Sequence, residues 1–191
     1  MEELKILQVV GYKNSGKTTH ITRWVELLTK CNKQVAVIKH HGHGGPLEQP
    51  NAETDSMRYL QAGSKSSIVF DDQLIQLHMK QHPSSLSVAI EMAKLAAPEL
   101  ILIEGVKEAH YPKVVLLRGL EDWLSLRLLE NVVAVIIDDA IEYDDIYEML
   151  SNVYEYDHTH SEHSIIGRGV IGLKRNDSEQ IDQFLINWLN E

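Results

Sequence analysis

The segment GYKNSGKTT, residues 11–19, has residue types and spacing that fit the pattern G-x-x-x-x-G-K-[ST]. In such a loop the backbone N–H groups point inward and hold phosphate oxygens, assisted by the N-terminus of the following helix. Gly11 and Gly16 permit the backbone angles and the close approach that the loop needs. Lys17 would reach the β- and γ-phosphates, and the Thr18 hydroxyl would bind Mg²⁺. The pattern therefore predicts a nucleoside triphosphate site.

The other positions of the loop complete the predicted nucleotide contacts. They are Tyr12, Lys13, Asn14, Ser15 and Thr19. The loop does not select a base, and the guanine-selecting motif N-K-x-D is absent from the chain. Lys13 stands at the third position of the loop, whereas dimeric signature-lysine ATPases carry their lysine at the second, which is Tyr12 here. The sequence therefore disfavours that ATPase class and leaves the base open.

Two acidic residues are candidates to complete the Mg²⁺ site. Glu104 ends the apolar run LILIE, where a carboxylate would hold Mg²⁺ through water beside the phosphate loop. Asp55 follows a long segment that contains Gly and Pro, which suits contact with the γ-phosphate or with Mg²⁺. The alternatives are a solvent-facing Glu104 and a helix cap at Asp55 or Ser56. We predict catalytic roles for Lys17, Asp55 and Glu104, and metal binding by Thr18, Asp55 and Glu104.

Basic residues and histidines form the next group of candidates. Lys39 and His40 end the segment QVAVIKH, where they would raise the positive potential near the phosphates or contact a second anionic substrate. Lys107 and Lys113 are predicted to form a basic rim at the same edge, with ordinary solvated lysines as the alternative. For the remaining clustered histidines we expect adventitious metal binding rather than a built site; they are His41, His43, His158, His160 and His163.

Apolar runs alternate with amphipathic stretches and predict the elements that position these residues. The predicted strands are 5–10, 34–38, 67–70, 100–103, 113–117 and 131–137. Several are apolar at consecutive positions, which is typical of strands covered on both faces, as in a parallel sheet. Helices are predicted directly after the phosphate loop, from Ser85 to before Pro98, and over 177–190 with Asp177 or Ser178 as the cap. This order predicts right-handed βαβ crossovers and a three-layer α/β/α fold with a mostly parallel sheet.

The composition narrows the class of protein. Of the 191 residues, 43% are hydrophobic, which suffices for one buried core, and we predict a single domain spanning 1–191. Lys and Arg total 18 against 28 Asp and Glu, and the net charge of −10 disfavours nucleic acid and anionic membranes as partners. Cys31 is the only cysteine, which excludes an internal disulfide.

The N-terminal segment, the length of the apolar runs and one acidic stretch bear on location and surface. The N-terminal MEELKILQVV is acidic where a signal peptide is basic, and no apolar run approaches the ~20 residues that span a bilayer. We therefore predict a soluble cytoplasmic protein. The acidic, tyrosine-rich segment 140–165 is predicted to be a surface insertion.

Taken together, four segments within residues 5–118 resemble one known family. They are GYKNSGKTT, VAVIKHHGHG, TDSMRYLQAG, and LILIEGVK with YPKVVLLR. In this order and spacing they resemble the MobB family, molybdopterin-guanine dinucleotide biosynthesis protein B. The resemblance implies a P-loop NTPase fold, GTP binding with weak GTPase activity, dependence on Mg²⁺ and a homodimer. It also implies a partner, the guanylyltransferase MobA, which attaches GMP to molybdopterin.

By position, the resemblance assigns the nucleotide site to residues 11–19, with Lys39, Asp55 and Glu104 in support. The region after Leu120 matches less specifically and receives no family role. The leading hypothesis is a GTP-binding accessory protein, with slow GTPase activity, in molybdenum cofactor biosynthesis. A small-molecule kinase and a nonhydrolysing, nucleotide-dependent adaptor are the alternatives. The arginines that a kinase would gather around its phosphoryl group are scattered along this sequence.

Overall fold

The computed structural model describes residues 4–42, 45, 47, 50–80, 85–141 and 170–191. These residues fall into two compact units: a sheet unit, residues 1–40 and 93–191, and a hairpin unit, residues 41–92. The predicted single domain stays a prediction. No helix in the described ranges is long and apolar enough to cross a membrane.

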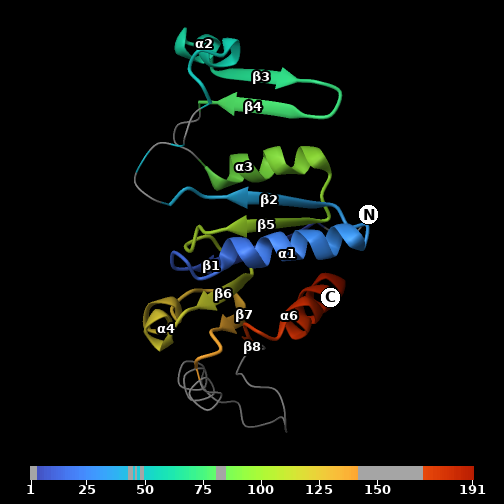
Figure 1. The fold of residues 1–191 in the computed structure, drawn as a ribbon, viewed down its shortest axis with the longest axis vertical. Coiled ribbons are helices and arrows are strands. Elements are labelled where there is room, and N and C mark those ends of the chain that lie inside the picture. The colour runs from blue at the N-terminus through green and yellow to red at the C-terminus, as the bar shows by residue number, and fades with distance from the viewer. Residues whose placement is uncertain (1–3, 43–44, 46, 48–49, 81–84, 142–169) are drawn as a thin grey trace. The chain divides into compact units, whose positions relative to one another are not determined.

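The sheet unit is built on six parallel strands in the order β2-β5-β1-β6-β7-β8, which Figure 1 shows from one edge of the sheet to the other. The strands are β1 (Lys5–Gly11), β2 (Val35–Lys39), β5 (Leu100–Glu104), β6 (Lys113–Leu117), β7 (Val132–Ile137) and β8 (Ile171–Lys174). Every residue of β5 and β6 is buried, because side chains on both faces of these central strands are covered. The predicted parallel α/β sheet is confirmed.

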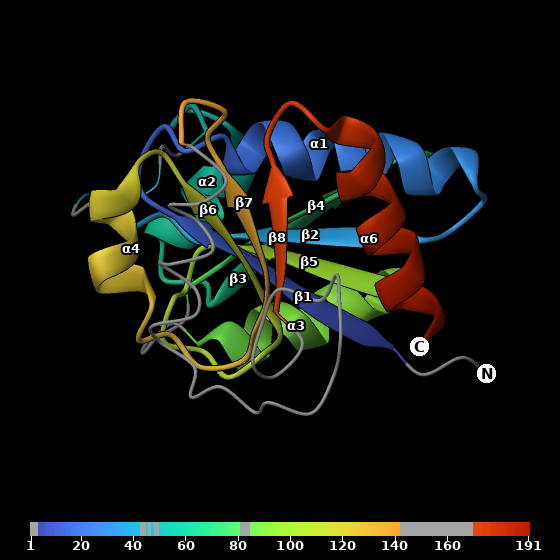
Figure 2. The same cartoon turned by 90° about the horizontal axis from the view of Figure 1, so that it is seen from below.

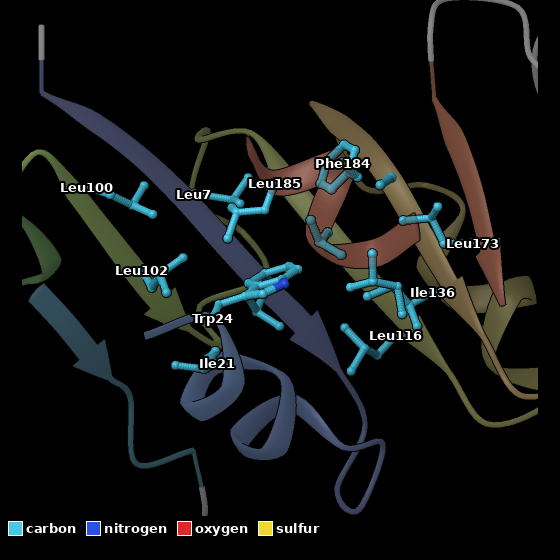
Figure 3. Packing of buried hydrophobic residues seen from close by; sticks show 14 of the residues in the cluster. Leu7, Ile21, Trp24, Leu100, Leu102, Leu116, Ile136, Leu173, Phe184 and Leu185 are labelled. Carbon is cyan, nitrogen blue, oxygen red and sulfur yellow. The ribbon is translucent and has the colours of Figure 1, made fainter. Parts of the chain in front are cut away.

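Helices α1 (Lys17–Lys30) and α6 (Ser178–Asn190) cover one face of the sheet. Trp24 of α1 is fully buried and lies at the centre of this core, with Phe184 and Leu185 of α6 on one side (Figure 3). Asp177 caps α6 as predicted, since its carboxylate accepts a hydrogen bond from the Gln180 N–H at 3.0 Å. The core thus fixes the helix that begins at the phosphate loop.

Helix α4 (Leu120–Leu126) covers the other face, where Trp123 and Leu126 are buried against side chains of β6 and β7. Figure 2 shows α4 on the opposite side of the strands from α1 and α6. A 3-10 turn, η1 (Lys94–Ala96), precedes β5. The sheet with helices on both faces makes the three layers that the sequence predicts.

The hairpin unit contains α2 (Asp55–Gln61), β3 (Ser66–Phe70), β4 (Ile75–Met79) and all but the last residue of α3 (Leu86–Ala93). Among the described residues, strands β3 and β4 pair with each other alone, and they are antiparallel. The predicted strand 67–70 therefore exists, but an assignment to the parallel sheet would be wrong. Its apolar side chains Ile68, Val69 and Phe70 are exposed rather than covered on two faces.

The sequence did not predict three elements, β4, α4 and β8. Each is short, seven residues or fewer, so that its apolar periodicity is weak over its own length. Most of the predicted insertion at 140–165 lies outside the described residues.

Candidate functional site

The phosphate loop connects β1 to α1 and holds a backbone shape that its glycines permit. Gly11 has φ 155°, and a Cβ there would lie 2.6 Å from the Ser15 Oγ and 2.7 Å from the Leu116 carbonyl oxygen. Gly16 has φ 89° and is the N-cap of α1. Asn14 also adopts a positive φ, 62°, which costs a non-glycine residue free energy. The surrounding structure must therefore hold this loop in place.

The start of α1 offers its free backbone N–H groups to an anion. No side chain caps the helix at Gly16, and no acidic residue stands in its first turn. The Lys17 Nζ donates hydrogen bonds to the carbonyl oxygens of Gly11, at 3.1 Å, and Tyr12, at 2.6 Å. With phosphate bound, the Lys17 Nζ would donate to charged phosphate oxygens in place of these carbonyls, and such hydrogen bonds are stronger.

The surroundings of Lys17 are strongly positive for an acidic protein. Burial lowers the pKa of the Lys17 ammonium; Glu104 opposes this shift, and three nearby cations add to it. Those cations are Lys107, Lys39 and Arg118. The local field therefore attracts a polyanion, although the chain as a whole carries a net charge of −10.

Thr18, Lys39 and Glu104 meet beside the phosphate loop. Because β2 and β5 are parallel neighbours, Lys39 and Glu104 are directly paired at the C-terminal ends of these strands. The Thr18 hydroxyl lies 3.1 Å from both carboxylate oxygens of Glu104, and the Lys39 Nζ lies 3.2 Å from one of them. Glu104 is 8% exposed, so the solvent-facing alternative is wrong. A hydroxyl and a carboxylate are hard oxygen donors that fit Mg²⁺.

Asp55 belongs to the hairpin unit and is the first residue of α2. Its side chain is 81% exposed and lies 3.7 Å from the Arg58 guanidinium. The cap position of α2 is Thr54, so the alternative of an N-cap at Asp55 or Ser56 is wrong by one or two residues. The predicted contact of Asp55 with the γ-phosphate or Mg²⁺ stays a prediction.

The two lysines predicted to form a basic rim lie in different places. Lys107 lies close to the phosphate loop, with its Nζ 4.0 Å from the centroid of the Tyr12 ring. Lys113 is the first residue of β6 and so lies at the N-terminal ends of the strands, away from the phosphate loop. It is 1% exposed, and its Nζ donates to the carbonyl oxygens of Ala109 and Tyr111. The prediction that Lys113 joins the rim is wrong, because it begins a strand rather than ends one.

The histidine clusters give no built metal site in the residues that the structure describes. His40 follows β2, and its backbone N–H donates to the Glu104 carbonyl oxygen at 3.1 Å. His43 and the predicted cluster at His158, His160 and His163 lie outside the described residues.

Sequence reasoning missed one group of residues at the site, the network of Arg118, Asp122 and Ser125. Arg118 follows β6, and its guanidinium carbon lies 5.3 Å from the centroid of the Tyr12 ring. The available signal was an Arg and an Asp four residues apart, directly after an apolar strand. That signal does not say that β6 lies next to β1, which carries the phosphate loop.

A parallel sheet of this order, with a glycine-bounded loop before α1, defines the P-loop NTPase fold. Residues 6–138 match the family model described as molybdopterin guanine dinucleotide synthesis protein B, MobB. The chain therefore belongs to the MobB family, which confirms the resemblance. It is 38% identical over 131 residues to a Bacillus subtilis protein named probable molybdopterin-guanine dinucleotide biosynthesis adapter protein, covering 69% of this chain and 75% of that one.

Two crystal structures are similar over almost the whole chain. For Bacillus subtilis MobB the identity is 30% and the TM-score 0.69, with 96% of this chain and 97% of that chain covered. For the MobB homolog from Bacillus stearothermophilus the identity is 26% and the TM-score 0.66, with 97% of each chain covered. The structural similarity therefore points to the same family as the sequence match.

Proposed function

We propose that this protein is a GTP-binding adapter in the synthesis of molybdopterin guanine dinucleotide, and that it hydrolyses GTP slowly with Mg²⁺. The observation that carries the proposal is the meeting of Thr18, Lys39 and Glu104 beside the phosphate loop. Membership of the MobB family supplies the biosynthetic context. The family is named for the synthesis of a guanine dinucleotide, which supports GTP rather than ATP as the bound nucleotide.

Each residue of the site has a distinct task in this proposal. The loop N–H groups and the Lys17 ammonium bind the β- and γ-phosphates. Thr18 and Glu104 would hold Mg²⁺, which would supply positive charge at the phosphates. Lys39, now paired with Glu104, would add positive charge at the phosphates and could donate to a phosphate oxygen.

Hydrolysis is expected to be slow because two arginines that follow strands β6 and β8, Arg118 and Arg175, are already paired with carboxylates. Arg118 is paired with Asp122 and Arg175 with Asp138, at 2.7 Å and 3.0 Å. Efficient GTPases and kinases use such a group on the transferred phosphate. This pairing argues against a small-molecule kinase, while a nonhydrolysing adapter remains the second candidate because curated relatives are named adapter proteins.

The proposed partners are a guanylyltransferase of the MobA type and a second copy of this chain. The homodimer is supported by the β3–β4 hairpin, whose apolar side chains are unusually exposed: Ile68 61%, Phe70 76%, Leu74 58% and Ile75 71%. Exposed apolar patches of this kind mark interaction sites, and a two-stranded hairpin is marginally stable alone. The proposal also includes a cytoplasmic location, which suits a family named for a biosynthetic role.

The test is titration calorimetry with GTP, GDP and ATP in Mg²⁺, together with phosphate release with and without a guanylyltransferase of the pathway. We expect GTP binding, a preference over ATP, and turnover well below the ~10 s⁻¹ of a median enzyme. Lys17→Ala should abolish most of the binding, because no other ammonium contacts the loop carbonyls in the described residues. GTP affinity of Lys17→Ala equal to that of the wild type would refute the site.

A further inference from the structure

We propose that Arg118 is a positioning residue of the nucleotide site. Asp122 of α4 holds its guanidinium, which in turn keeps the first half of the phosphate loop in its phosphate-binding shape. The inference rests on the proposed function in one respect: the loop must be the place where nucleotide binds. It assigns to α4, an element outside the nucleotide motifs, the task of preorganising that loop.

The first link is the Arg118–Asp122 pair. The Arg118 Nη2 and Nε donate to the two carboxylate oxygens of Asp122 at 2.7 Å and 2.9 Å, and the Arg118 backbone N–H adds a third bond at 3.0 Å. The Asp122 side chain is 3% exposed. A two-pronged contact with a buried carboxylate fixes the plane of the guanidinium, which a single charge pair would not do.

The second link joins Arg118 to the loop. Its remaining terminal nitrogen, Nη1, donates to the Lys13 carbonyl oxygen at 3.3 Å. In a trans peptide the C=O and the following N–H point in opposite directions. Arg118 therefore turns the N–H of Asn14 away from itself and, in the proposed site, toward the phosphate. Asn14 is the non-glycine residue with φ 62°, so this is the peptide that most needs to be held.

A third link starts from the same helix and reaches the neighbouring residue. The Ser125 Oγ donates to the Asp122 carbonyl oxygen at 3.1 Å and lies 2.6 Å from the Tyr12 hydroxyl. Because a serine hydroxyl has one hydrogen, Tyr12 is the donor in the second bond. Tyr12 and Lys13 are thus both tied to α4, whose Trp123 and Leu126 are buried in the core.

Positioning explains this arrangement better than plain attraction between Arg118 and phosphate. The buried Asp122 carboxylate, 2.7 Å away, offsets the positive charge of Arg118, whereas a group that serves only to attract an anion gains nothing from such a partner. Lys107 Nζ lies 4.0 Å from the centroid of the same Tyr12 ring, and among the described residues it has no carboxylate partner. Attraction and positioning therefore fall to different residues and can be separated by experiment.

The experiment compares Arg118→Lys and Asp122→Asn with the wild type, and uses Arg127→Lys, the same change at the exposed C-cap of α4, as the matched control. Calorimetry with GDP is done at low and high salt. Hydrogen exchange of the amides of residues 11–17 is measured without nucleotide, and thermal unfolding shows whether each variant is folded. GDP is the probe because it lacks the γ-phosphate, so the contact predicted for Asp55 does not contribute to its affinity.

We expect both variants to bind GDP about tenfold more weakly, as for one lost hydrogen bond to a charged group. The loss should persist at high salt, since salt screens attraction but not a change of loop shape. The amides of 11–17 should exchange faster, and the control should match the wild type. Arg118→Lys is the milder change if Asp122→Asn fails to fold, because it keeps the charge and loses only the fork.

Wild-type GDP affinity in Arg118→Lys would overturn the inference, as would a lowered melting temperature with unchanged affinity and exchange. A loss of affinity that vanishes at high salt would also overturn it, in favour of simple attraction. If the wild type binds neither GDP nor GTP, the proposed function fails, and the exchange measurement alone then decides whether Arg118 orders the loop.

Discussion

Replacing Glu104 with Gln removes one negative charge from the proposed Mg²⁺ site at nearly constant shape. Glu104 is 8% exposed, and each of its carboxylate oxygens lies 3.1 Å from the Thr18 hydroxyl. These two contacts share one hydroxyl hydrogen, so they count as one hydrogen bond. Its partner Lys39 is 59% exposed, and a pair with one partner in solvent contributes at most about 1 kcal/mol. Loss of fold stability should therefore be small.

The effect on metal-dependent binding should be larger than the effect on stability. Mutating a residue that orients a metal ligand or its water typically lowers metal affinity by about 10- to 100-fold, which is about 1.4 to 2.8 kcal/mol. With Mg²⁺ present, Glu104→Gln should weaken GDP and GTP binding by this factor. Without Mg²⁺ the same variant should bind as well as the wild type or better, because the carboxylate then only repels phosphate.

The assay is titration calorimetry with GDP and GTP, each in Mg²⁺ and in a chelator. Glu99→Gln is the matched control, since Glu99 directly precedes the same strand at its other end and pairs with Lys33 at 2.6 Å. The control should leave both conditions unchanged. An equal loss of affinity in Mg²⁺ and in chelator would refute the assignment, and an unchanged Mg²⁺ dependence would place the acid elsewhere in the chain.

Three further predictions concern the other parts of the chain. Asp55→Asn should leave GDP affinity intact while lowering GTP affinity or phosphate release; if neither changes, Asp55 has no role at the γ-phosphate. Burial, and then the charges of Arg175 and Arg23, lower the pKa of His20 below 6.5, so the unfolded chain takes up a proton more readily than the folded one. The free energy of unfolding should therefore fall as the pH drops below that value, and denaturant titrations across pH of about 5 to 8 should show a flatter profile for His20→Gln. Phe70 and Ile75 are cross-strand partners on the exposed hairpin, and changing both to Lys should turn a dimer into a monomer in light scattering; a wild type that is already monomeric contradicts the dimer.

Much of the site was predictable because it is encoded locally. Residues 11–19 combine a short pattern with the required context, an apolar strand before it and an amphipathic helix after it. Lys39 and Glu104 could be placed beside the loop because each ends an apolar run, and the carboxyl ends of parallel strands meet at one edge of a sheet. Consecutive apolar residues in β5 and β6 indicated burial on both faces, which the structure confirms.

The sequence by itself determined the phosphate loop, the parallel strands and the acid beside them, because each depends on neighbours within a few residues or on a rule of sheet geometry. Only the tertiary structure decided which residues reach the loop from elsewhere. Arg118 became part of the site because β6 lies next to β1, and Lys113 was removed from it because it stands at the other end of that same strand. Strand order is set by packing over long sequence distances, and no local pattern in this chain carries it.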